Sequence, residues 1–161
     1  MHINSVEAPG LSAARRLALL KIKHNMKGEL SMEILKIAIP SEAPGGLDSE
    51  RSGHFGHCPM FTLVELDGNK IGQVSIVHNQ VHEAGGCMQV VGLLKKQGVE
   101  ALVVHGMGRG PFMGMQKEGI SVYFADQSYN NVAMAVDGFL QQKLPQFQAA
   151  QLCTSNGNCH H

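Results

Sequence analysis

The stretch GVEALVVHGMGRGPFMGMQKEGISVYFA, residues 98–125, decides the fold class. Ala101–Val104 is a short apolar run, typical of a strand that is buried on both faces. A glycine-rich turn follows it, Pro111 suits the first position of a helix, and Gly119 is expected to end that helix. Ser121–Ala125 is then a second strand. Two strands joined by a helix lie parallel in one sheet, so this stretch predicts an α/β protein.

The segment before this unit predicts a first strand followed by a hairpin. Ile34–Ile39 forms the first strand, which Pro40 is expected to close, and a polar, glycine-containing loop comes next. Phe61–Leu66 and Ile71–His78 are two further strands. They flank Asp67-Gly68-Asn69, and Asp-Gly is a strong hairpin signal.

Two more helices complete the pattern. Apolar residues recur at helical spacing after Gly85-Gly86, and Gly98 is the expected C-cap of that helix. Asn130 or Asn131 caps a final helix, which ends before Pro145. The order strand, hairpin, helix, strand, helix, strand, helix predicts a three-layer α/β domain, with a mixed sheet flanked by helices.

The chain is expected to divide into one domain and two flanking segments. Residues 1–31 are interpreted as a loosely attached N-terminal extension, in which Ser12 caps a short basic helix from Ala13 to about His24. Such a basic segment could also contact a membrane or a partner. Residues 32–145 form the regular domain. Residues 146–161 have no convincing periodicity and are interpreted as a flexible tail, with donors at Cys153, Cys159, His160 and His161.

Composition narrows the function classes. The chain has 161 residues, 43% hydrophobic, and its 13 Lys and Arg balance 13 Asp and Glu, so no basic field exists to hold nucleic acid. Its longest apolar runs, such as Ala101–Val104, are far shorter than the roughly 20 residues that cross a membrane. No secretory signal pattern is present, so we expect a cytoplasmic protein with free or metal-binding thiols. The excess lies in 19 Gly, 9 His, 9 Met and 4 Cys, a composition suited to soft metals.

The first cluster of candidate metal ligands is Ser52-Gly53-His54-Phe55-Gly56-His57-Cys58. Imidazole and thiolate bind transition metals and iron–sulfur species, and the glycines allow the backbone to approach a bulky ligand closely. The alternative is that the histidines are ordinary loop residues and that Cys58 is a small buried apolar residue.

The second cluster comprises His78, His82 and Cys87, with Gly85-Gly86 directly before the cysteine. Cys87 lies at a helix start, where the helix dipole and free N–H groups lower the pKa of a thiol and favour a bound anion. It is therefore the best thiolate candidate in the chain. His78, at a strand end, could simply be solvated.

The third cluster is the turn His105-Gly106-Met107-Gly108-Arg109-Gly110. Turns of this kind present backbone N–H groups to anions. Its glycines do not form G-x-G-x-x-G, which argues against a dinucleotide site. Nor does the chain contain a Ser/His/Asp order, paired carboxylates or a P-loop lysine, so hydrolysis and phosphoryl transfer have no support.

Taken in order, four motifs resemble the dinitrogenase iron-molybdenum cofactor biosynthesis family, the group of NifX, NafY, the C-terminal part of NifB and the orange protein. The motifs are Ile37-Ala38-Ile39-Pro40, Gly53-His54-Phe55-Gly56-His57-Cys58, Gly85-Gly86-Cys87 and Gly106-Met107-Gly108-Arg109-Gly110. The resemblance spans about residues 33–145. It implies a ribonuclease-H-like fold that binds preformed metal–sulfur clusters.

The resemblance also implies a set of site residues. The cluster-binding histidine of the family lies in its His-Phe-Gly motif, which places that role on His54. The expected cofactor-binding residues are His54, Phe55, Gly56, Gly85, Gly86, Gly106, Gly108 and Gly110, and the expected metal ligands are His54, His57, Cys58 and Cys87. An anionic, sulfide-rich cluster needs few covalent ligands and many N–H donors, which glycine loops and a helix N-terminus provide.

The resulting hypothesis is a non-enzymatic carrier or chaperone for a metal–sulfur cluster in cofactor assembly. The cluster is expected to contain molybdenum, with iron or copper, and the partner is a donor or recipient protein of that assembly. Two alternatives stay open: an interaction or regulatory domain of the same fold that binds no cluster, and an oxidoreductase partner that uses Cys87. The second is the weaker, because no C-x-x-C is present.

Overall fold

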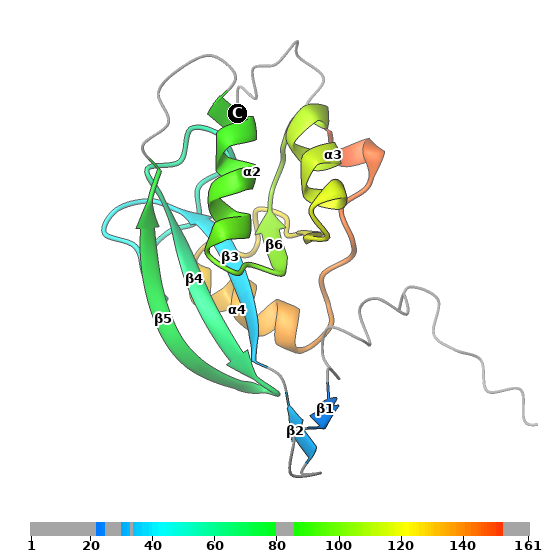
Figure 1. Cartoon of the computed structure of the whole chain (residues 1–161). Coiled ribbons are helices and arrows are strands. Elements are labelled where there is room, and N and C mark those ends of the chain that lie inside the picture. The colour runs from blue at the N-terminus through cyan, green and yellow to red at the C-terminus, as the bar shows by residue number, and fades with distance from the viewer. Residues whose placement is uncertain (1–21, 25–29, 33, 80–85, 153–161) are drawn as a thin grey trace, which may run out of the picture.

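The computed structural model of the chain describes residues 22–24, 30–32, 34–79 and 86–152. Two short strands, β1 (Ile22–His24) and β2 (Leu30–Met32), pair antiparallel and form a separate small sheet. The expected helix is therefore wrong over Ile22–His24, because these residues are extended and pair with β2; residues 13–21 lie outside the described ranges. The small sheet lies at one end of the molecule (Figure 1).

The main sheet has five strands in the order β5-β4-β3-β6-β7. Its members are β3 (Leu35–Ser41), β4 (Met60–Asp67), β5 (Lys70–His78), β6 (Ala101–Val104) and β7 (Ser121–Phe124). The strands β3, β4 and β5 pair antiparallel, whereas β3, β6 and β7 pair parallel. The predicted mixed sheet is confirmed, including the hairpin, in which Asp67 pairs with Lys70 around Gly68 (φ +61°).

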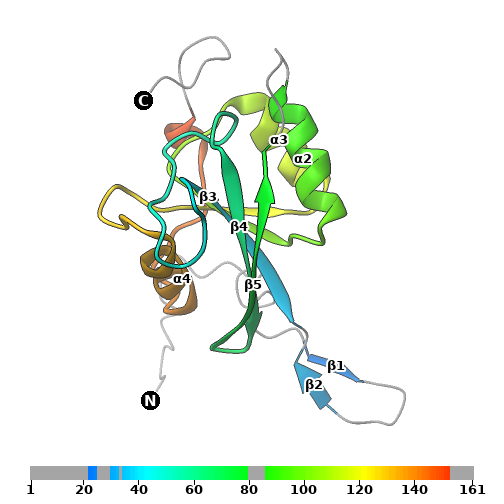
Figure 2. The same cartoon turned by 90° about the vertical axis from the view of Figure 1, so that its left-hand side faces the viewer.

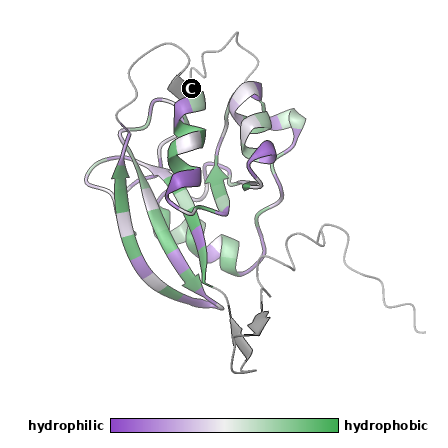
Figure 3. Ribbon diagram, in the orientation of Figure 1, coloured by the Kyte–Doolittle hydropathy of each residue, from purple (hydrophilic) through white to green (hydrophobic). Residues whose placement is uncertain are grey.

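Helices cover both faces of this sheet. Figure 2 shows α2 (Gly86–Lys96) and α3 (Arg109–Lys117) on one side and α4 (Val132–Leu140) on the other. The alternation of side chains in β6 builds both cores: Leu102 and Val104 pack beneath α2 and α3, while Ala101 and Val103 face α4. Figure 3 shows β6 as uniformly hydrophobic and β5 as alternating, because β6 is buried on both faces and β5 is an edge strand. The predicted three-layer α/β fold is confirmed.

The two glycines that are predicted to end helices have the expected backbone geometry. Gly98 and Gly119 have φ of +79° and +76°, a left-handed conformation that glycine adopts at little cost. After Gly98, Val99 N–H donates to Leu94 C=O at 3.1 Å, the bond of a Schellman motif, and Ile120 N–H donates to Met115 C=O at 2.9 Å in the same way. Both stops end helices whose N-termini lie at the opposite edge of the sheet (Figure 1).

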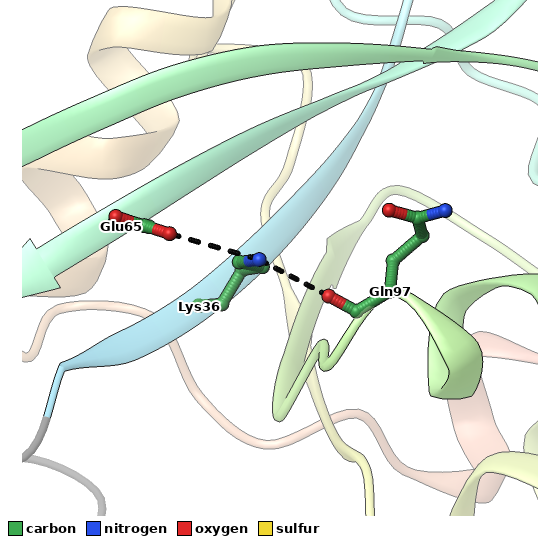
Figure 4. A network of polar contacts seen from close by, with 3 residues as sticks. All are labelled: Lys36, Glu65 and Gln97. Carbon is green, nitrogen blue, oxygen red and sulfur yellow. Dashed lines mark hydrogen bonds and ion pairs between the residues drawn. The ribbon is translucent and has the colours of Figure 1, made fainter.

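A polar contact also fixes the end of α2 to the sheet. Figure 4 shows Lys36 Nζ between Glu65 Oε1, at 3.6 Å, and the main-chain oxygen of Gln97, which accepts a hydrogen bond at 3.1 Å. The ion pair is partly exposed and contributes little by itself. The bond to Gln97 satisfies one of the last carbonyl groups of the helix and joins it to β3.

Pro40 does not close the first strand as expected, because β3 continues to Ser41. The carbonyl group of Pro40 accepts a hydrogen bond from Ser52 N–H at 2.9 Å, so it bonds to the loop after β3 rather than to β4. Pairing of β3 with β6 ends at Ala38 and Leu102. The missing N–H of Pro40 therefore removes no bond from either neighbouring strand.

The third helix begins earlier than predicted. Its first residue is Arg109 and its N-cap is Gly108, so Pro111 occupies the third helical position rather than the first. Proline is tolerated here because N–H groups in the first turn of a helix have no partner within the helix. The last helix is capped by Asn131, whose side chain accepts a hydrogen bond from Met134 N–H at 2.8 Å, which selects Asn131 over Asn130.

Residues 146–152, expected as part of a flexible tail, pack against the domain. Phe124 N–H donates to Pro145 C=O and Phe147 N–H donates to Val122 C=O, both at 2.8 Å, so residues 145–147 run antiparallel along the outer side of β7. Phe147 is buried, with its ring 5.2 Å from that of Phe112. The 3₁₀ helix Ala149–Gln151 follows. Phe147, two backbone bonds to β7 and the packing of Leu152 against the core hold this segment. These separate contacts do not require a periodic pattern in its sequence.

Candidate functional site

The candidate site lies at the carboxyl edge of the parallel strands. The segments that follow β3, β6 and β7 meet there and enclose a pocket of about 260 Å³. It is lined by Arg51, Ser52, Gly53, His105, Gln127, Tyr129 and Asn130. The chain leaves β3 towards β4 on one side, and leaves β6 towards β7 on the other. Ligands of open α/β sheets bind at such a switch point.

The long loop between β3 and β4 is fixed at the pocket by backbone bonds. Ser41 and Arg51 form an antiparallel bridge, and Ser52 N–H donates to the carbonyl group of Pro40, near the end of β3. Arg51 N–H donates to Asn130 C=O at 3.1 Å, which ties the same loop to the segment after β7. These bonds position Ser52 and Gly53 at the mouth of the pocket.

Arg51 is the main cation of the site, and the sequence analysis missed it. Its Nε donates to Tyr129 C=O at 2.6 Å, and its Nη2 donates to the carbonyl groups of Ala125, at 3.1 Å, and Asp126, at 2.7 Å. Nη1 is buried and has no hydrogen-bond partner within the described ranges. Burial lowers the pKa of the Arg51 guanidinium, against an opposing effect of Asp126. The one feature of the sequence that could have indicated this role is the position of Arg51, a charged residue within a polar, glycine-containing loop.

Asp126 is held by its own loop rather than by the pocket. Its Oδ1 accepts hydrogen bonds from the backbone N–H and the hydroxyl of Ser128. These bonds, with a smaller effect of Arg51, hold the pKa of the Asp126 carboxyl below its usual range. The carboxyl is exposed and stays negatively charged. Its hydrogen bonds to Ser128 fix the turn that follows β7 beside Arg51.

The predicted His-Phe-Gly motif directly follows the pocket residue Gly53. A Cβ at Gly53 would meet nothing within 4 Å, so the backbone is open to an approaching ligand there. His54 is half-buried, and its backbone N–H donates to Ser52 Oγ at 3.3 Å. Three residues further on, His57 is exposed. Neither histidine is among the residues that line the pocket: His54 directly follows the lining residue Gly53 in the chain, and His57 is three residues further on in solvent.

Phe55 and Cys58 of the same loop belong to the core instead. Phe55 is 2% exposed and its ring contacts that of Phe61 at 5.8 Å. Cys58 is also 2% exposed, and its thiol donates to Phe55 C=O at 3.4 Å. Burial raises the pKa of the Cys58 thiol to about 12. This arrangement favours the alternative in which Cys58 is a small buried residue, because a metal ligand must be a thiolate.

The glycine-rich turn after β6 combines a buried half and an open half. Gly106 and Met107 are buried, Gly108 is partly exposed, and Gly110 lies in the exposed first turn of α3. The N-cap Gly108 has no side chain, so it leaves the first N–H groups of the helix accessible to a ligand. One turn later, a Cβ at Gly114 would lie 3.1 Å from Met88 Cε, so this glycine permits the close packing of α2 and α3.

The second predicted cluster is only partly described. His78 is exposed at the end of β5, and Gly86 and Cys87 form the first turn of α2, so the predicted helix start is confirmed. His82 and Gly85 lie outside the described residues. Throughout the described ranges, no three His, Cys, Asp or Glu side chains are grouped so that they could hold a metal ion.

Fold and site together define a three-layer α/β binding domain with its ligand crevice at a sheet switch point. The sequence identifies which domain of this class it is: the chain belongs to the dinitrogenase iron-molybdenum cofactor family, which matches residues 33–142. Membership gives the protein a cofactor-binding or carrier role connected with the biosynthesis of that cofactor.

Several known proteins are similar to this chain over most of their own length. The uncharacterized protein MJ0580 of Methanocaldococcus jannaschii is 29% identical over 122 residues, which cover 74% of this chain and 97% of the relative. The apo form of the orange protein from Desulfovibrio gigas is 28% identical, with a TM-score of 0.63, over 73% of this chain and 96% of that protein. The crystal structure of PH0822 gives 25% identity and a TM-score of 0.60 over 71% and 98%. Within the described residues, no helix is both long and apolar enough to span a membrane.

Proposed function

We propose that this protein binds a preformed metal–sulfur cluster at the carboxyl edge of its sheet and carries it between assembly proteins. The cargo is an iron-molybdenum cofactor-like cluster or a molybdenum–copper sulfide, and His54 is a direct ligand. The observation that supports this most is the pocket formed by the three segments after β3, β6 and β7, with the His-Phe-Gly motif beside it.

The chemistry of the pocket suits an anionic cluster. Arg51 contributes a positive charge to the pocket lining, and carbonyl groups of the segment after β7 hold its guanidinium in place. Further along the segment after β6, beyond the residues that line the pocket, the N–H groups of Arg109 and Gly110 lie in the first turn of α3, where the helix dipole favours negative charge. Sulfide atoms accept such hydrogen bonds, so the cluster needs only one or two covalent ligands from the domain.

Each predicted ligand receives a role consistent with its place. His54 binds the metal, and His57 and Cys87 are further candidate ligands on the loop after β3 and the first turn of α2. Gly53 and Gly108 leave room for the cluster. Cys58 and Phe55 support the loop from within the core. Carriage rather than catalysis is proposed, in the cytoplasm, with a donor or recipient protein of cofactor assembly as the partner.

Anaerobic reconstitution tests the proposal. The protein is incubated with tetrathiomolybdate and Cu(I), or with tetrathiomolybdate, iron and sulfide, then desalted, and its visible spectrum and metal content are measured. The wild type is expected to retain molybdenum with the second metal in a fixed ratio. His54→Ala is expected to lose most of it, and His57→Ala part of it.

The matched control is His24→Ala, because β1 lies at the end of the molecule away from the starts of α2 and α3 (Figure 1). This variant should retain metal like the wild type. A wild type that emerges from desalting without metal would refute the carrier function and favour an interaction domain of the same fold. Equal metal content in His54→Ala and the wild type would remove His54 from the role of ligand.

A further inference from the structure

Asn79 lies at the carboxyl edge of the sheet and binds the loop that carries the His-Phe-Gly motif. Strand β5 ends at His78, which pairs with Met60, and Met60 pairs in turn with Ser41 at the end of β3. Asn79 is the next residue along the chain and is only 7% exposed. A buried amide needs hydrogen-bond partners, and the loop between β3 and β4 provides them.

Both hydrogens of the Asn79 amide are directed at this loop. Nδ2 donates to Gly56 C=O at 3.1 Å and to Cys58 C=O at 2.9 Å. An amide nitrogen carries two hydrogens, one for each of these carbonyl groups. The main-chain N–H of Asn79 donates to Pro59 C=O at 3.0 Å. Three hydrogen bonds from one residue therefore hold the backbone of residues 56–59.

His57 is the residue between the two carbonyl groups that the amide binds. Phe55 and Cys58, on either side of it in the turn, are each 2% exposed and pack in the core, whereas His57 is exposed. The turn is thus held from the core by two side chains and from β5 by Asn79. An imidazole on a backbone that is already fixed has less conformational entropy to lose when it binds a metal.

We propose that Asn79 is a positioning residue for His57: it bonds the carbonyl groups on both sides of this residue and so holds the imidazole ready to bind the cluster. This inference rests on the proposed carrier function. Groups that orient a metal-binding histidine without touching the metal typically raise the metal affinity about 10–100-fold. Asn79 should therefore affect cluster affinity although its side chain is buried against the turn.

A double-mutant cycle tests the inference. Wild type, Asn79→Ala, His57→Ala and Asn79→Ala/His57→Ala are loaded anaerobically with tetrathiomolybdate and Cu(I), and cluster affinity is measured by competition with a copper chelator. Asn79→Ala and His57→Ala are each expected to lower the affinity about tenfold. The double variant should bind no more weakly than His57→Ala, because Asn79 acts through that imidazole. A structural role independent of His57 would instead multiply the two losses.

Nuclear magnetic resonance of the cluster-free protein provides a second measurement. The backbone order parameter of His57 is expected to be about 0.85 in the wild type, as in a rigid backbone, and below about 0.6 in Asn79→Ala. The matched control is Asn69→Ala, an exposed position in the hairpin turn at the other end of β5, which should change neither the affinity nor the order parameter. Asn79→Asp keeps the size of the side chain but has no N–H group, and it replaces Asn79→Ala in the cycle if the smaller side chain prevents folding.

Three results would overturn the role of Asn79 while the carrier function stands. They are a cluster affinity of Asn79→Ala equal to that of the wild type, multiplied losses in the double variant, and an order parameter of His57 below about 0.6 in the wild type. A wild type that takes up no cluster at all would overturn both the role of Asn79 and the carrier function.

Discussion

Arg51 should be the most consequential single residue of the site for stability, and its replacement by alanine removes three hydrogen bonds to carbonyl groups. Two of them, from Nε to Tyr129 and from Nη2 to Ala125, are partly buried, and the third, to Asp126, is exposed. A buried hydrogen bond from a charged donor contributes about 1.5–3 kcal/mol, and an exposed one far less.

The gross loss is therefore about 3–6 kcal/mol, and the desolvation of the guanidinium reduces it. Nη1 is buried without a partner in the described part of the chain, and burial lowers the pKa of Arg51. Burying this charge therefore costs free energy, which offsets part of the gain from the hydrogen bonds. We expect Arg51→Ala to lower the free energy of unfolding by about 2–3 kcal/mol. Arg51→Lys keeps the charge but lacks the planar guanidinium that forms these bonds together. This variant should lower the free energy of unfolding by about 1–2 kcal/mol.

Urea unfolding at neutral pH measures these differences, with Lys143→Ala as the control. Lys143 is exposed, and its replacement should change the free energy of unfolding by less than about 0.5 kcal/mol. Hydrogen exchange adds a local measurement, because the N–H groups of Arg51 and Ser52 bond to Asn130 and Pro40 and should exchange faster in Arg51→Ala. A loss of less than about 0.5 kcal/mol in Arg51→Ala, with unchanged exchange, would refute the view that this side chain joins the two loops.

Three further predictions concern single residues. Burial raises the pKa of Cys58 from 9.0 to about 12, so between these values the unfolded chain loses the thiol proton while the folded chain keeps it. The free energy of unfolding should fall as pH rises through this window, and less so in Cys58→Ala; parallel pH profiles of the two proteins in urea unfolding would contradict this. Gly119→Ala should destabilise by about 1 kcal/mol because φ is +76°, whereas Gly92→Ala, within α2, should stabilise by about 0.5–1 kcal/mol. Neither new Cβ meets an atom within 4 Å, so equal effects in thermal unfolding would rule out backbone conformation as the cause. Asn131→Ala, which removes the cap of α4, should cost about 1 kcal/mol, and an unchanged melting temperature would show that this cap contributes nothing.

The order of elements could be predicted because its signals are local. Apolar runs marked β6 and β7, and the glycine stops at Gly98 and Gly119 marked the ends of the helices between strands. In both stops the hydrogen bonds join residues only a few positions apart. A pattern that depends on neighbouring residues is visible in the sequence, and the mixed sheet follows from it.

The interior of the site could not be predicted, because it depends on contacts between distant residues. Arg51 bonds to a carbonyl group 78 residues away, and no property of its own loop indicates that partner. The same is true of Phe147, which packs against Phe112 and Phe124 from a segment without periodicity. The sequence also left two interpretations of Cys58 open, and its burial beside Phe55 favours a small buried residue over a metal ligand.

The pairing of residues 145–147 with β7 bears on where the folding unit ends. The family matches residues 33–142, and a protein cut at that point would lack the backbone partners of Val122 and Phe124. It would expose the outer edge of β7 to pairing with other chains, and the ring of Phe112 would lose its neighbour. Evolutionary similarity therefore marks a shorter unit than the physical one, which extends at least to Leu152. Any fusion or fragment of this protein should keep that segment if it is to remain a single, separate domain.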